Sequence, residues 1–212
     1  MRLDLTPDMV LQAYRMGVFP MAESRDDQQL YWFDPLQRGV LPLEGVHLSR
    51  SLRRRIRAEP FRLTLDHAFG DVIAGCAARD STWINAQITD IFCALHAMGH
   101  AHSIEVWEGE ALVGGLYGVA LGGVFCGESM FSRRTDASKI ALATLVTHLR
   151  ACGFTLFDTQ YLTEHLASMG GVEIPRAAYR ARLAQALKVD AGFHRLPLPN
   201  AQDVVQRNSH RS

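Results

Sequence analysis

The sequence predicts an α+β fold in which helices cover one mixed β-sheet. The first observation is the order of the local patterns: a strand, two helices, three consecutive strands, a helix, a strand and further helices, which is typical of a single helix-covered sheet. The second is length, because 212 residues can form one full domain and a small accessory domain. The third is composition: 48% hydrophobic and 21% charged residues are ordinary values for a soluble globular protein.

The first part of the chain predicts a small domain of its own. Thr6 can cap a helix whose first position is Pro7 and whose end is marked by Gly17. The segment directly after that glycine is expected to be a loop. An aromatic, extended run at 30–35 and an apolar run at 40–42 follow, and we expect these two runs to pair as a small antiparallel sheet.

Local signals also define the elements of the larger domain that follows. The run at 61–65 alternates with a period of two, which indicates a strand. Gly99 ends an amphipathic helix, Gly109 lies in a hairpin turn, and Asp136 caps the longest helix. The expected strands are 61–65, 102–107, 111–120, 124–130 and 154–160. The expected helices are a basic one between Ser49 and Pro60, then 68–78, 89–98, 137–152, 164–169 and 175–187.

The end of the chain predicts a loose tail, because the sequence from Val189 onward is polar and contains prolines. The expected organisation is therefore a small N-terminal domain at 1–44, a main domain at 45–190 and a C-terminal tail at 191–212.

Charge and hydropathy exclude several classes of protein. No apolar run reaches the length of about 18 residues that a transmembrane helix needs, so no membrane partner is expected. The N-terminus lacks the apolar core of a signal peptide, which makes a cytoplasmic location the default. The 22 basic and 22 acidic residues balance, which argues against a strongly basic nucleic-acid-binding protein. The balance hides one local cluster, which consists of Arg50, Arg53, Arg54, Arg55 and Arg57.

The cysteines and histidines do not predict a metal site. The four cysteines contain no CxxC pair and lie among apolar neighbours, so we expect buried free thiols. His96, His100 and His102 lie close together in the sequence, but Gly99 interrupts the helix between the first two. Capping and surface hydrogen bonding are the expected roles of these histidines.

Two short polar segments follow strand-like apolar runs. One is 127–132, with the sequence GESMFS, and the other is 157–160, with the sequence FDTQ. Asp158 and Gln160 are two residues apart, so in a strand they point to the same face. Polar groups on a buried face need partners or a substrate, which makes these segments the first candidates for a functional site.

The order of elements resembles the fold of N-acetyltransferases. Those proteins usually carry a glycine-rich pyrophosphate loop before the helix that follows the third core strand. Here the junction at 132–136 reads SRRTD and contains no glycine. A helix N-terminus can still bind an anion, but the sequence does not support coenzyme A.

A more specific resemblance rests on motifs that occur in order from about residue 10 to about residue 187. They are YRMGVFP at 14–20, WFDP at 32–35, HLSRS at 47–51, TWI at 82–84, GHAHSIEVW at 99–107, LVGGLYGV at 112–119, GESMFS at 127–132, ASK at 137–139, DTQ at 158–160, HLASMG at 165–170 and EIP at 173–175. Together they resemble the leucyl/phenylalanyl-tRNA–protein transferase family. Many linked motifs are far more specific than any one of them.

The resemblance implies a reaction, partners and a fold. Such enzymes move leucine or phenylalanine from aminoacyl-tRNA to the α-amine of a protein that begins with Lys or Arg, and the new N-terminus marks that protein for degradation. The implied fold is a small N-terminal domain and an N-acetyltransferase-like catalytic domain. The family uses no coenzyme A and no metal.

The resemblance also implies a catalytic group. Asp158 and Gln160 match the family's catalytic pair, in which a carboxylate can orient an amine and accept its proton. The alternative is a buried pair that ties the strand end to the next loop. Glu128 matches an acidic residue of the same site that would attract a positive acceptor. The alternative role of Glu128 is an ion pair with Arg133 or Lys139.

Further residues match the binding sites for the donor tRNA. The apolar pocket for the donor amino acid is expected from Leu116, Phe125, Met130, Ser132, Leu145, Leu149 and Phe157, although a plain core explains these residues equally well. Leu145 and Leu149 stand where bulkier aromatics are expected, so they would leave more room. Met21 stands where a tryptophan is expected to stack on the 3′-terminal adenosine. The five arginines at 50–57 are expected to bind tRNA phosphates, and a solvated helix face is their alternative.

Three rival functions remain open from the sequence. The first is a transferase of the same fold with altered amino acid or acceptor specificity, which Met21, Leu145 and Leu149 motivate. The second is a module that binds RNA or protein N-termini without turnover. The third and weakest is a coenzyme A-dependent N-acetyltransferase.

Overall fold

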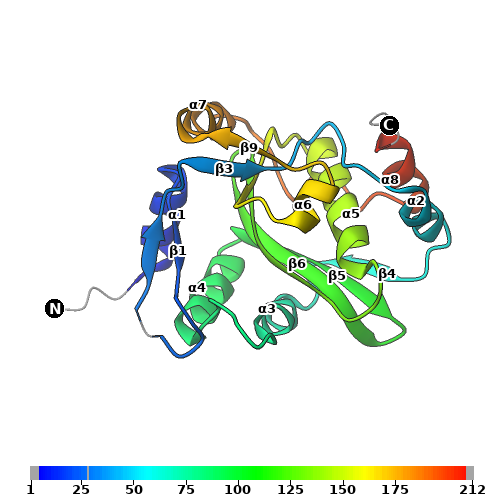
Figure 1. Cartoon of the computed structure of the whole chain (residues 1–212), viewed down its shortest axis with the longest axis horizontal. Coiled ribbons are helices and arrows are strands. Elements are labelled where there is room, and N and C mark those ends of the chain that lie inside the picture. Colours follow the sequence, from blue (N-terminus) through cyan, green and yellow to red (C-terminus); the bar gives the residue numbers. More distant parts are fainter. Residues whose placement is uncertain (1–4, 28, 209–212) are drawn as a thin grey trace.

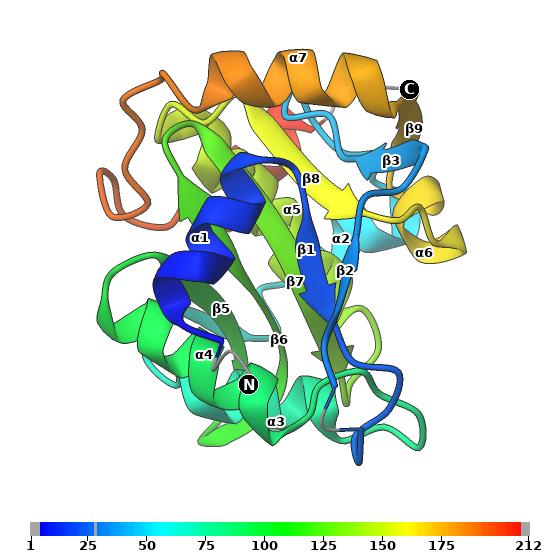
Figure 2. The ribbon, with the colours of Figure 1, turned by 90° about the vertical axis from the view of Figure 1, so that its left-hand side faces the viewer.

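The computed structural model describes residues 5–27 and 29–208. Its N-terminal part contains α1 (Pro7–Arg15) and a two-stranded sheet of β1 (Phe19–Met21) and β2 (Tyr31–Phe33). The expected cap is present, since the Thr6 hydroxyl accepts a hydrogen bond from the Met9 N–H at 3.3 Å. This small N-terminal unit packs on one face of the main sheet (Figures 1 and 2).

The main sheet has seven strands in the order β4-β5-β6-β7-β8-β3-β9. All neighbours are antiparallel except β7 and β8, which run parallel. The strands are β3 (Gln37–Val40), β4 (Arg62–Leu65), β5 (Ala101–Glu108), β6 (Ala111–Leu121), β7 (Val124–Ser132), β8 (Leu156–Gln160) and β9 (Val172–Pro175).

Helices cover both faces of this sheet, and each face has its own core. The first core contains apolar residues of α2 (Arg50–Arg57), α5 (Ala137–Ala151), α6 (Glu164–Ser168) and α8 (Ala201–Arg207). The second contains residues of α1, α3 (Phe69–Ala77), α4 (Ala86–Ala97) and α7 (Arg176–Ala186). The predicted fold class, a helix-covered mixed sheet with a small N-terminal domain, is confirmed (Figure 1). Within the described residues, no helix is long and apolar enough to span a membrane.

The strand pairing of the N-terminal part differs from the prediction. The segment after Gly17, expected to be a loop, contains β1, and β1 pairs with β2. The next strand, β3, leaves that unit and inserts between β8 and β9 of the main sheet. Gly39 makes this insertion feasible, because a Cβ on it would lie 2.6 Å from the backbone of Tyr161. Strands of three or four residues carry too little pattern to reveal such partners.

The prediction of a loose tail is wrong for the described residues. Phe193 is 4% exposed, and Val204 and Val205 of α8 are buried against α2 and α5. The side chain of Asn208 accepts a hydrogen bond from the Val46 N–H at 2.7 Å and donates one to the Thr147 hydroxyl at 3.0 Å. A few apolar residues and one buried amide therefore dock a segment whose composition is mostly polar. Residues 209–212 lie outside the described residues.

The parallel pair β7–β8 creates an opening in the sheet. The two strands pair only from Val124 and Leu156 to Cys126 and Asp158. Beyond Cys126, β7 continues along β6, whereas β8 continues along β3. The two polar segments noted in the sequence therefore begin where these neighbouring strands stop pairing.

Candidate functional site

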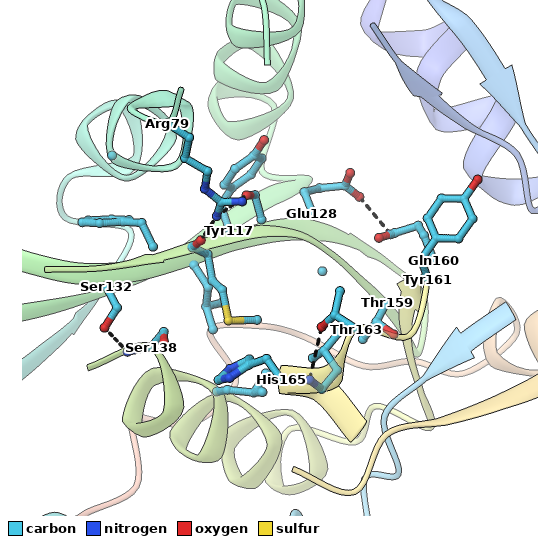
Figure 3. Close-up of a pocket in the computed structure, with 18 of the residues that line it drawn as sticks. Arg79, Tyr117, Glu128, Ser132, Ser138, Thr159, Gln160, Tyr161, Thr163 and His165 are labelled. Atoms are coloured by element: carbon cyan, nitrogen blue, oxygen red, sulfur yellow. Dashed lines mark hydrogen bonds between the residues drawn. The ribbon is translucent and has the colours of Figure 1, made fainter. Parts of the chain in front are cut away.

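A cavity of about 690 Å³ lies at this opening. Its wall is formed by the ends of β7 and β8, by β1 and β6, by the end of α3, by the first turns of α5 and by the segment that leads into α6 (Figure 3). Glu128 and Gln160 both line it, one from each side of the opening. The two candidate segments are thus brought together at one cavity.

Glu128 occupies a β-bulge. On β7, Gly127 pairs with Gly118 and Ser129 pairs with Tyr117, so Glu128 is the extra residue. A bulge interrupts the ladder and redirects a side chain. The Glu128 side chain stays half-buried at the cavity wall, where its Oε1 accepts a hydrogen bond from Gln160 Nε2 at 3.4 Å.

The environment of Glu128 favours its neutral form. Burial raises its pKa to about 8, and the charge of Asp158 adds to this effect, whereas the Tyr14 hydroxyl and Arg38 oppose it. Near neutral pH the carboxyl group is therefore mostly protonated. A modest change in its surroundings, such as an arriving cation, would be enough to ionise it.

Gln160 has a strained backbone. Its φ angle is 57°, which lies in the left-handed region that residues with a side chain rarely adopt. The Gln160 N–H donates to Asp158 Oδ1 at 2.9 Å, and this hydrogen bond fastens the turn. Such strain persists only where the surroundings hold it, and it concentrates at functional sites.

Asp158 lies behind the cavity wall and not in it. Its fully buried carboxylate accepts hydrogen bonds from Arg38 Nε at 2.8 Å and Nη2 at 2.6 Å, and from the Tyr179 hydroxyl at 2.8 Å. With the Gln160 N–H added, both oxygens are occupied. Asp158 was expected to form a catalytic pair with Gln160, but only Gln160 reaches the cavity. Asp158 is thus placed to position Gln160.

Arg38 is a functional candidate that the sequence did not reveal. Its guanidinium lies 4.7 Å from the ring centre of Phe19 and 4.3 Å from that of Tyr179, and its Nη1 donates to the Gly17 carbonyl at 2.9 Å. It is 1% exposed. Its partner Asp158 is 120 residues away, so no local spacing could have signalled the pair.

Among the described residues, three that line the cavity have a buried polar side-chain atom without a hydrogen-bond partner. These atoms are the hydroxyl oxygens of Tyr117 and Thr159 and the Nε2 atom of His165. Burial, with a smaller effect of Lys139, lowers the pKa of His165, so its ring is neutral near pH 7. Unpartnered buried polar groups are uncommon in proteins, and these three atoms are almost inaccessible to solvent although their residues line the cavity.

The expected donor pocket is only partly at the cavity. Leu116, Met130, Ser132 and Phe157 line it, whereas Phe125, Leu145 and Leu149 are fully or almost fully buried in the core. On α5 the cavity is lined by Ser138 and Leu142. Leu145 and Leu149 continue the same helix stripe away from the cavity, and the second is about 10 Å along the axis from Leu142. They are therefore not positioned to enlarge the cavity directly.

The expected adenosine contact, Met21, does line the cavity. Trp83 and Tyr161 are among several further aromatic residues that line the cavity and that the sequence did not single out. Trp83 lies in the TWI motif, which was the available signal. Phe19, Trp32 and Phe33 are aromatic residues near Met21 in the sequence that could replace the expected tryptophan. Of these, Phe19 lines the cavity, whereas Trp32 does not and is 42% exposed.

The basic cluster on α2 lies outside the cavity. Arg50, Arg54 and Arg57 are exposed and follow one another at helical spacing, so they form a stripe on one face. Arg53 donates to a backbone carbonyl at 3.0 Å, and Arg55 lies over an aromatic ring. The cationic side chains at the cavity itself belong to other residues, Arg79 and Arg133.

Comparison with known proteins gives a family match over nearly the whole chain. A model described as leucyl/phenylalanyl-tRNA protein transferase matches residues 40–184, and the model of that family's N-terminal domain matches residues 3–36. A relative from Cereibacter sphaeroides is 58% identical over 209 residues, which cover 98% of both chains. One from Roseobacter denitrificans is 56% identical, with 98% of this chain and 99% of the relative covered. Both are named leucyl/phenylalanyl-tRNA–protein transferase.

One further relative and one solved structure are also similar to this chain. The relative, from Dinoroseobacter shibae, has the same name and is 59% identical over 95% of this chain and 91% of its own. The solved structure is of L-PGS from Bacillus licheniformis, with a TM-score of 0.47 and 11% identity over 85% of this chain and 76% of that chain.

Proposed function

The chain belongs to the leucyl/phenylalanyl-tRNA–protein transferase family. We propose that it transfers the amino acid of an aminoacyl-tRNA to a protein N-terminus in the cavity between β7 and β8. It is an aminoacyltransferase that uses a charged tRNA and a protein as substrates. The observation that carries the proposed site is the juxtaposition of Glu128 and Gln160 at the opening.

The proposed substrates follow from the family name and from the cavity. Leucine or phenylalanine is the donor amino acid, and Leu116, Met130 and Phe157 offer an apolar wall for its side chain. The acceptor is a protein that begins with Lys or Arg, which the transfer marks for degradation in the cytoplasm.

The proposed chemistry is direct attack of the neutral α-amine on the ester carbonyl. A C–N bond forms, the bond from the carbonyl carbon to the tRNA 3′ oxygen breaks, and the proton of the amine passes to the Glu128 carboxylate. That proton then leaves with the 3′ hydroxyl. A carboxylate whose pKa, about 8, lies near the working pH is suited both to accept a proton from the attacking nitrogen and to return it to the leaving oxygen.

Gln160 and Asp158 have different roles in this proposal. The Gln160 side-chain amide donates to Glu128 and holds the reacting groups beside it. Asp158 does not touch them; together with Arg38 it keeps the left-handed turn at Gln160 in place. The structure thus supports Gln160 and Glu128 as the contacting residues, and Asp158 as a positioning residue.

The 3′ end of the tRNA would lie along the outer part of the cavity. Met21, Trp83 and Tyr161 provide apolar and aromatic surface for the terminal adenosine, since bases stack well on aromatic rings. Arg79, whose Nη2 lies 3.5 Å from the Ser129 hydroxyl and also donates to the Met130 carbonyl, brings positive charge to this edge.

The stripe of Arg50, Arg54 and Arg57 is the proposed contact for phosphates of the acceptor stem. Replacing Arg54 by alanine is expected to reduce the slope of log K against log salt for tRNA binding by about 1, because each neutralised phosphate contributes about that much. Filter binding over a range of salt concentrations measures the slope. Arg62→Ala, at an exposed arginine on β4, is the matched control, and equal slopes in all three proteins would remove α2 from the tRNA site.

A matrix of transfer reactions tests the proposed function. tRNAs charged with Leu, Phe, Met or Arg are combined with peptides that begin with Lys, Arg, Asp or Glu, and the extended peptide is measured by mass spectrometry. We expect extension of the Lys and Arg peptides by Leu and Phe. Transfer of another amino acid, or to acidic N-termini, would instead establish a changed specificity. Binding of charged tRNA without any extended peptide would contradict the enzyme assignment itself.

A further inference from the structure

A second group of chemically capable side chains lies away from the transfer cavity. Asp66, His102 and His194 each offer a ligand atom, and these atoms all lie within 4.8 Å of one another. We call these three residues the Asp66 cluster. They come from the end of β4, from β5 and from the segment between α7 and α8, so the fold brings together three distant parts of the chain.

The hydrogen bonds of the cluster converge on one carboxylate. Asp66 Oδ2 accepts from His102 Nδ1 at 2.7 Å and lies 2.8 Å from His194 Nε2. Its other oxygen, Oδ1, accepts from the Ser103 N–H at 2.7 Å. Two imidazoles thus face one carboxylate oxygen.

We propose that the Asp66 cluster is a binding site for a divalent transition-metal ion of the zinc class, coordinated by Asp66, His102 and His194. Two imidazoles and a carboxylate are a donor set that zinc binds with a water molecule in the fourth position. In a tetrahedral zinc site, ligand atoms stand about 3.4 Å apart. The present contacts of 2.7 and 2.8 Å would therefore lengthen by less than 1 Å.

The surroundings already hold the ligands as a metal site requires. The ring of His102 stacks on Phe193, with 4.2 Å between ring centres and 11° between planes. The Phe193 carbonyl is hydrogen-bonded to His148 Nε2 at 2.7 Å, which anchors the backbone next to His194. These contacts restrict the ring of His102 and the backbone next to His194.

The backbone conformation of Asp66 and the solvent exposure of the three ligands also fit a metal site. Asp66 has a φ angle of 54°, in the left-handed region, although it is not a glycine. The side chain of His194 is 60% exposed, whereas those of His102 and Asp66 are 6% and 11% exposed. An ion can therefore reach two nearly buried ligands from solvent and be closed in by the third.

Metal binding would use the Nδ1 lone pair of His102 and the Nε2 lone pair of His194, so a neutral ring carries its proton on the other nitrogen when the ion is bound. The ion would fasten the segment that carries Phe193 to β5. Phe193 in turn stacks on Phe125, 5.6 Å away, in the core beside the cavity wall.

Zinc chloride titrated into the chelator-treated full chain tests the proposal by calorimetry, with Co²⁺ absorption as a second readout. We expect one ion per chain and a rise in Tm of about 5 °C or more at saturating zinc. His194→Ala removes an exposed side chain, so it should fold normally, and it is expected to weaken binding about tenfold or more. Asp66→Asn should do the same.

His100→Ala is the matched control, because His100 is a half-buried histidine outside the cluster; it should bind zinc like the wild type. Co²⁺ should give the strong visible absorption of a tetrahedral site in the wild type and in His100→Ala only. Absence of zinc binding would overturn the proposal and leave the cluster as a hydrogen-bonded clasp. Equal zinc affinity in wild type and His194→Ala would overturn it too, since the ion would then bind elsewhere.

Discussion

Replacement of Asp158 by asparagine is expected to destabilise the fold by about 3–5 kcal/mol, because it leaves the buried Arg38 guanidinium without its counter-charge. It is also expected to lower kcat/KM for transfer about 100-fold or more, since a misplaced group that orients the reactants costs about that much. Urea unfolding and a leucine-transfer assay measure the two effects. Both follow from the closed arrangement of Asp158 with Arg38, Tyr179 and the Gln160 N–H.

Two further variants separate the loss of stability from the loss of activity. Asp190→Asn removes a carboxylate that is 97% exposed and pairs with Arg195 at 2.9 Å, so it should cost less than about 1 kcal/mol and leave transfer intact. The double variant Arg38→Met, Asp158→Leu replaces the ion pair by apolar groups and should regain stability. It should not regain activity, because the Gln160 N–H then lacks its acceptor. Wild-type transfer by Asp158→Asn would refute the positioning role.

Replacement of Glu128 by glutamine is expected to slow single-turnover transfer about 100-fold or more, the usual contribution of a general base. Binding of aminoacyl-tRNA should stay within about threefold of wild type, since the amide keeps the shape of the carboxyl group. Rapid-quench measurement of peptide extension, together with filter binding of the charged tRNA, gives both quantities.

The same substitution should make the protein more stable, which rules out unfolding as the cause of the slower transfer. The pKa of Glu128 is 4.5 in the unfolded chain and about 8 in the folded one. The protonated carboxyl group therefore adds its full stability to the fold below pH 4.5, and the free energy of unfolding falls as the pH rises from there towards 8. Glutamine does not titrate and avoids that loss. At pH 7 we expect a gain on the order of 2–3 kcal/mol by urea unfolding. Glu110→Gln, at an exposed hairpin turn, should change neither stability nor rate, and a destabilised Glu128→Gln would contradict the assigned pKa.

The sequence was sufficient for the elements of the main domain, because strands and helices such as β6 and α5 are long enough to show their periods. It was not sufficient for β1 and β9, which have three and four residues. The sequence also did not predict that the C-terminal segment packs on the core. One buried aromatic residue, Phe193, anchors this segment although its composition is mostly polar. Such short or isolated contacts are decided by tertiary packing and leave no local pattern.

The candidate site was predictable in part for similar reasons. Two polar segments after apolar runs indicated Glu128 and Gln160, and the fold does bring them together. The bulge that turns Glu128 into the cavity depends on the pairing with β6, and the Arg38–Asp158 contact depends on β3 joining the sheet beside β8. Spacing on α5 showed which face Leu145 and Leu149 share but not their depth below the cavity.

The proposed mechanism requires that an ionisable Glu128 in the cavity takes the proton of the attacking amine. The pH dependence of kcat/KM for transfer, measured in the wild type and in Glu128→Gln, tests this most directly. Between about pH 6 and pH 7.5, the wild type must lose a proton from Glu128, with its pKa of about 8, and another from the acceptor amine. We expect log kcat/KM to rise with a slope about one unit lower in Glu128→Gln than in the wild type. Parallel profiles in the two proteins would contradict the claim and would place the base elsewhere.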